Sequence, residues 1–120
     1  MRIALVLALL WSAPVAAQDL DCTDRAALTQ SALTQCAGRD LAFWDGLLNN
    51  AYQQVIATLD GAQEENLRAA QRAWITFRDL TCDMESARFQ GGSIAPMIEL
   101  DCLARLTERR ARDLETYLQN

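Results

Sequence analysis

The sequence contains no histidine and no lysine, and its 11 arginines face 16 aspartates and glutamates. Without histidine, the ordinary Ser-His and Cys-His nucleophile systems cannot form. The net charge of −5 makes nucleic acid and anionic membrane surfaces poor partners. This charge would keep an exported protein soluble, and it would also attract a basic protein partner. We therefore predict a non-enzymatic protein without a cofactor.

The first 17 residues have the features of a secretory signal peptide. Arg2 precedes an apolar run over residues 3–11, and Pro14 and small residues lead to a predicted cleavage after Ala17. The run is too short for an ordinary membrane-spanning helix, which needs roughly 20 apolar residues. Gln18 occupies the position where a lipoprotein would carry cysteine. We expect a periplasmic or secreted protein, with neither a lipid anchor nor stable membrane insertion.

Removal of residues 1–17 leaves 120 − 17 = 103 residues, enough for one domain over residues 18–120. Apolar side chains recur there at steps of three and four residues, which is typical of amphipathic helices. Three such patterns cover residues 33–59, 67–89 and 100–117. No alternating strand pattern competes with them. The fold class is therefore predicted to be all-α, a small antiparallel helical bundle.

The same patterns predict where the helices start and which faces they bury. Thr29 and Ser93 suit helix N-caps, and Glu64 lies where a second helix would open after the Asp60-Gly61 turn. Pro96 fits the first turn of the third helix. The second helix is expected to bury one stripe of residues: Leu67, Ala70, Trp74, Phe77, Thr81, Met84 and Arg88/Phe89.

Four cysteines are arranged symmetrically about two predicted chain features. Cys82 and Cys102 each lie ten residues from Gly92, and Cys22 and Cys36 each lie seven residues from Thr29. This symmetry predicts the disulfides Cys22–Cys36 and Cys82–Cys102. Four cysteines allow three pairings. In two antiparallel helices joined at residues 60–61, Cys36 and Cys82 would lie at about the same level, so Cys36–Cys82 with Cys22–Cys102 is also possible. Zinc binding is disfavoured because the spacings of 14, 46 and 20 contain no CxxC motif.

A polar layer is predicted where the antiparallel helices cross the middle of the bundle. In antiparallel helices, residues that are equally far in sequence from the connecting turn lie at the same level of the bundle. This rule places four residues at about one level: Asp45, Trp74, Arg78 and Arg110. An arginine there could pair with the carboxylate and lie against the indole ring. Such a layer could be the floor of a binding pocket or an ion pair that fixes helix register. We favour the structural role.

A set of residues spread over most of the chain forms one combined pattern: Asp45, Leu48-Asn49, Tyr52, Leu67, Gln71-Arg72-Ala73-Trp74, Arg78-Asp79, Cys82, Gly91-Gly92-Ser93, Pro96, Cys102, Thr107 and Arg110. In this pattern the chain resembles the lysozyme inhibitor LprI-like N-terminal domain family, over about residues 22–116. The resemblance implies a small exported helical domain and, by the family's name, inhibition of lysozyme. Some relatives are lipoproteins, and Gln18 departs from that pattern.

The resemblance implies a binding protein that occludes a lysozyme-type muramidase, and the acidic charge would suit a basic enzyme. The turn formed by Gly91, Gly92 and Ser93 is the candidate contact, since glycines allow close backbone approach and a neighbouring disulfide would fix the turn. The alternative, which we favour for the glycines themselves, is that they only make a tight turn. The alternative function is an envelope interaction protein with another partner and no effect on lysozyme. Asp79 and Asp83 could form a carboxylate pair, but a solvated acidic face explains them better.

Overall fold

The computed structural model describes residues 19–120, so the predicted signal peptide and Gln18 lie outside the described residues. Every secondary-structure element in these residues is a helix, which confirms the predicted all-α class. The elements are a short 3-10 helix η1 (Arg25–Ala27) and the helices α1 (Gln30–Ile56), α2 (Gly61–Ala87) and α3 (Ala95–Gln119). Within residues 19–120, no helix has both the length and the apolar character needed to span a membrane.

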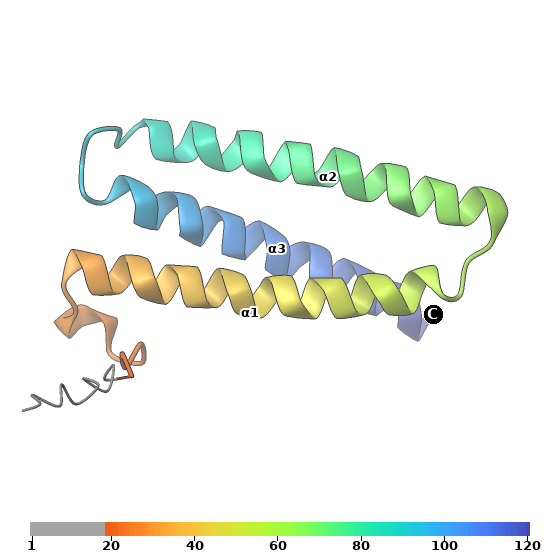
Figure 1. Ribbon diagram of the computed structural model, residues 1–120, viewed down its shortest axis with the longest axis horizontal. Coiled ribbons are helices and arrows are strands. Elements are labelled where there is room, and N and C mark those ends of the chain that lie inside the picture. Colours follow the sequence, from red (N-terminus) through yellow and green to blue (C-terminus); the bar gives the residue numbers. More distant parts are fainter. Residues whose placement is uncertain (1–18) are drawn as a thin grey trace, which may run out of the picture.

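The three long helices run antiparallel to their sequence neighbours, with α3 packed against both others (Figure 1). The contact between α1 and α3 is the larger one, and α1 and α2 barely meet. Figure 1 also shows that α2 diverges from α3 toward the α1–α2 turn. The bundle is therefore tighter at the α2–α3 turn than at its opposite end.

The helix ends agree with most of the predicted start signals. The Thr29 hydroxyl accepts a 3.2 Å hydrogen bond from the Ala32 N–H, which confirms Thr29 as the α1 N-cap. Helix α2 begins at Gly61, with Glu64 in its first turn, and α3 carries Pro96 in its first turn. The prediction that Ser93 caps α3 was wrong, because Ile94 is the N-cap residue and no side chain caps it.

Both predicted disulfides are present, and the rival pairings are excluded. Cys22–Cys36 has a Cα–Cα distance of 5.7 Å and ties the N-terminal segment to α1. Cys82–Cys102 has a Cα–Cα distance of 5.4 Å and joins α2 to α3. No cysteine is left free for a metal. In the described part of the chain, no group of three acidic or cysteine side chains is positioned to hold a metal ion.

Two apolar clusters form the core. The cluster near the α1–α2 turn consists of Leu48, Ala51, Val55, Ala111 and Leu114. The cluster near the α2–α3 turn consists of Cys82, Cys102 and Leu106. The second cluster includes the disulfide itself, so the covalent link and apolar burial hold the same pair of helices together.

The prediction for the buried face of α2 was partly wrong. Leu67 and Trp74 do pack against the core, but Phe77 is 57% exposed and Met84 is 66% exposed. At about 100° per residue, Phe77 lies about 140° around the helix from Cys82. Because Cys82 must face Cys102 to form the disulfide, Phe77 and Met84 turn toward solvent.

Candidate functional site

The α2–α3 turn is an exposed projection whose backbone requires glycine. Gly91 has a φ of +85°, which residues with a side chain rarely adopt. The N–H of Gly92 donates a 2.9 Å hydrogen bond to the Phe89 carbonyl, and a Cβ at Gly92 would lie 3.1 Å from that oxygen. Ser93 is exposed beside them. The two glycines therefore fix the shape of the turn and leave the Ser93 side chain facing solvent.

The base of this turn is held by two kinds of link between α2 and α3. The Cys82–Cys102 disulfide is buried, and Arg105 forms hydrogen bonds of 2.9 and 3.0 Å to the two carboxylate oxygens of Glu85. Both hydrogen bonds come from the same nitrogen, Nη2, so this exposed pair adds one charge-assisted contact between the helices beside the covalent link. The turn is therefore attached to a rigid support.

Acidic side chains line two shallow hollows beside the turn. Asp83 and Glu99 contribute to both hollows, which have volumes of about 410 and 520 Å³. Neither carboxylate forms an ion pair with another described residue. Asp79, the other member of the predicted acidic pair, instead accepts a 2.8 Å hydrogen bond from Arg78. Asp83 and Glu99 are thus two negative charges beside the turn without an ion-pair partner among the described residues.

Exposed apolar residues continue from this acidic region along α2. Leu80 and Met84 are each 66% exposed, and Phe77 precedes them on the same helix face. We call the surface formed by Phe77, Leu80 and Met84 the α2 apolar stripe. Its apolar spacing also fits a core-facing stripe, so the sequence alone does not mark it as an exposed surface.

The structure brings three of the four predicted polar-layer residues together. Arg78 lies 5.1 Å from the centroid of the Trp74 ring, and its Nη1 atom lies 3.6 Å from the Asp45 carboxylate. The side chain of Arg78 is 18% exposed, whereas that of Asp45 is 46% exposed. Arg110 has a different neighbour: its Nε donates a 3.0 Å hydrogen bond to Gln71. Among the described residues, no ion pair joins Arg110 to Asp45.

Comparison with known proteins identifies relatives over most of the chain. A family model described as "Lysozyme inhibitor LprI" matches residues 22–114. An uncharacterized protein of Rhizobium meliloti (strain 1021) is 34% identical over 130 residues, which cover 98% of this chain and 94% of that protein. The chain is also similar to Lipoprotein LprI of Mycobacterium tuberculosis (strain ATCC 25618 / H37Rv), with 40% identity over 68 residues.

That second alignment covers 57% of this chain and 32% of the mycobacterial lipoprotein, so it spans about a third of the relative's length. Lipoprotein LprI of Mycobacterium bovis (strain ATCC BAA-935 / AF2122/97) matches with the same identity and coverage. No solved structure is significantly similar to the chain. The matched family region contains both disulfides and all three long helices up to Leu114.

Proposed function

The chain belongs to the lysozyme inhibitor LprI family, and from this membership we propose that it is an exported protein that inhibits lysozyme-type muramidases by occluding the enzyme. The observation that carries the proposal is the family match over residues 22–114. The match includes the disulfide-linked helices and the turn between them. A non-enzymatic role agrees with a chain that has no histidine and no free cysteine.

We assign the contact with the enzyme to the α2–α3 turn and the adjoining part of the α2 apolar stripe. Gly91, Gly92 and Ser93 project from a base fixed by Cys82–Cys102, so little conformational entropy would be lost on binding. Leu80 and Met84 offer apolar area beside the turn. An apolar centre with a charged rim is the usual composition of a protein interface.

Charge supports a basic enzyme as the partner. After removal of residues 1–17, which contain Arg2 and no acidic residue, 10 arginines face 16 acidic residues, a net charge of 10 − 16 = −6. Asp83 and Glu99 place two unpaired negative charges next to the turn. Such charges steer a basic partner toward a surface and mainly raise the association rate.

Two disulfides indicate an extracytoplasmic compartment, where thiols are oxidised. We place the protein in the periplasm or outside the cell, where it would meet a muramidase. The mycobacterial relatives carry the name lipoprotein. Lipid attachment is not expected here because Gln18 stands at the predicted cleavage site, and this expectation stays a prediction.

The direct test is a muramidase assay with purified residues 18–120 and several lysozyme classes. We expect inhibition near stoichiometric concentration for a basic lysozyme. Ser93→Trp, which keeps both glycines, should weaken inhibition at least tenfold because a bulky side chain blocks entry of the turn. Gln119→Trp places the same side chain at the exposed C-terminal end and should have no effect. Both variants must retain helicity and both disulfides.

Salt dependence tests the steering argument. The double variant Asp83→Asn/Glu99→Gln should lower the association rate constant several-fold at low salt and reduce its dependence on ionic strength. Glu65→Gln/Glu115→Gln removes the same charge from exposed sites far from the turn and is the matched control. If the wild-type protein fails to inhibit every lysozyme class at large molar excess, the proposal falls. An envelope interaction role with another partner would replace it.

A further inference from the structure

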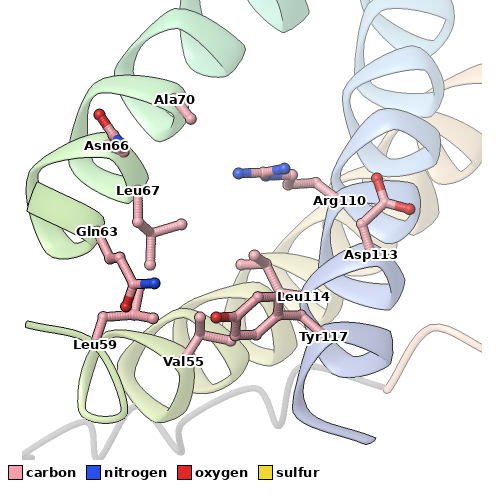
Figure 2. Close-up of a pocket in the computed structure, with 10 residues that line it drawn as sticks. All are labelled: Val55, Leu59, Gln63, Asn66, Leu67, Ala70, Arg110, Asp113, Leu114 and Tyr117. Carbon is pink, nitrogen blue, oxygen red and sulfur yellow. The ribbon is translucent and has the colours of Figure 1, made fainter. Parts of the chain in front are cut away.

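A cleft opens at the end of the bundle opposite the α2–α3 turn. It lies between the N-terminal half of α2 and the C-terminal half of α3, with the end of α1 as its floor (Figure 2). Its volume is about 400 Å³, within the usual range for small-molecule sites. This cleft is separate from the surface that we assign to the muramidase.

The floor and walls of the cleft are mainly apolar. Val55 and Leu114 are buried members of the core cluster and form the floor. Leu59, Leu67 and Tyr117 form the sides, and all three also border solvent. A hydrocarbon chain placed here would remove these side chains from water, which favours binding in proportion to the apolar area covered.

One arginine gives this apolar cleft a charged group. Figure 2 shows the Arg110 side chain extending from α3 across the cleft toward Leu67 and Ala70. Its Nε donates to Gln71 at 3.0 Å, and the four N–H groups on Nη1 and Nη2 have no hydrogen-bond partner among residues 19–120. These four donors are therefore free to bind an anion.

Arg110 differs from the other partly buried arginines because it forms no ion pair with a carboxylate of residues 19–120. Arg25 pairs with Asp40, and Arg78 pairs with Asp79 and Asp45. Arg110 forms no ion pair with any described carboxylate, although Asp113 also lines the cleft. A partly buried guanidinium with spare donors is a binding group for a carboxylate.

We propose that this cleft binds a single-chain amphipathic anion, with its carboxylate on Arg110 and its hydrocarbon chain along Leu59, Leu67 and Tyr117. Asp113 at the same edge would repel a second negative charge, so a monoanion fits better than a dianion. The proposal does not depend on lysozyme inhibition, because the two surfaces lie at opposite ends of the bundle.

The test compares three probes of equal chain length by isothermal titration calorimetry, all below micelle formation: octanoate, octan-1-ol and octylammonium. Octanoate should bind at one site and at least tenfold more tightly than octan-1-ol, because a charge-assisted hydrogen bond adds to chain burial. Octylammonium should not bind. Equal binding of octanoate and octylammonium, or binding at many sites, would overturn the proposal.

Variants separate the contribution of Arg110 from that of the apolar wall. Arg110→Gln should reduce octanoate affinity to that of octan-1-ol and leave octan-1-ol affinity unchanged. Leu67→Gln should weaken both probes, and Arg109→Gln, an exposed neighbour that does not line the cleft, should weaken neither. Unchanged octanoate binding by a folded Arg110→Gln variant would exclude the proposed site.

Nuclear magnetic resonance of the wild-type protein provides a test that needs no variant. Octanoate should shift the side-chain signals of Leu59, Leu67 and Tyr117, and leave those of Leu80 and Met84 unmoved. Sedimentation with phosphatidylglycerol vesicles tests a bilayer as the source of the anion. Binding to vesicles without binding to octanoate would overturn the single-chain proposal in favour of a membrane surface.

Discussion

Asp45 on α1 and Arg78 on α2 lie 3.6 Å apart and form the one ion pair between these two helices in the described part of the chain. The same guanidinium lies 3.5 Å from the hydroxyl of Thr107 on α3, which is completely buried. Arg78 therefore contacts all three long helices. Since α1 and α2 barely pack against each other, this side chain is one of the few links across that side of the bundle.

We predict that Asp45→Ala lowers the free energy of unfolding by less than about 1 kcal/mol, as is usual for exposed ion pairs. A cost of about 3–5 kcal/mol would require a truly buried pair. Asp45 is half-exposed, and Arg78 keeps its closer contact with Asp79, at 2.8 Å. Urea denaturation measures the change. Affinity for a muramidase should be unchanged, in agreement with a structural role for the layer.

Arg78→Ala is the matched comparison and should cost more, about 1–3 kcal/mol. It removes packing on Trp74 as well as the links to Thr107 and Asp45. The double variant isolates the pair itself, because its coupling energy excludes the other contacts of Arg78. Loss of binding at normal stability in Asp45→Ala would show that this residue belongs to a functional site.

The helical class and both disulfides could be predicted from sequence because they depend on short-range patterns. Apolar steps of three and four residues mark helices, and two glycines mark the α2–α3 turn. Once a helix pair is antiparallel, cysteines at equal distances from the turn meet, as Cys82 and Cys102 do. These features need no knowledge of how the helices are rotated about their axes.

Helix rotation and lateral placement could not be predicted in the same way. Leu67, Trp74 and Phe77 form a plausible apolar stripe, but the Cys82–Cys102 link selects a different face and exposes Phe77. The sequence distance of a residue from a turn gives its height along the bundle, but it does not say which helices contact each other there. Arg110 therefore bonds to Gln71 at the edge of a cleft that no sequence pattern indicated.

We predict unequal roles for the two disulfides. Cys82→Ala/Cys102→Ala should lower the free energy of unfolding by about 2–4 kcal/mol. The reason is that Cys82 and Ser86 are the only buried residues of α2, so complete burial contributes less to holding this helix than it does for α1 and α3. Peptide mapping without reducing agent should first recover both pairings in the purified wild-type protein.

Cys22→Ala/Cys36→Ala should act mainly on the N-terminal segment, because its disulfide ties residues 19–29 to α1 rather than joining two long helices. Hydrogen exchange should accelerate in that segment and stay slow in α1 and α3. Arg39 and Arg25 still bond to Leu20 and Asp40, which limits the loss. An equal fall in global stability for both double variants would contradict this division of roles.

Asp101 lies partly buried on α3 and should make the stability of the fold depend on pH. Burial raises the pKa of Asp101, with Arg25 lowering it and Asp40 raising it to lesser degrees. A raised pKa means that the folded state binds this proton more tightly than the unfolded state. The charged carboxylate therefore destabilises the fold above the raised pKa, and this cost disappears as pH falls toward the ordinary value of 3.8.

Asp101→Asn should consequently raise the melting temperature by about 1–3 °C at pH 7, and the difference from wild type should shrink to nothing below about pH 3.8. Glu115→Gln, an exposed charge of the same sign, should show no comparable pH dependence. A lower melting temperature for Asp101→Asn at pH 7 would mean that the attraction to Arg25 outweighs burial.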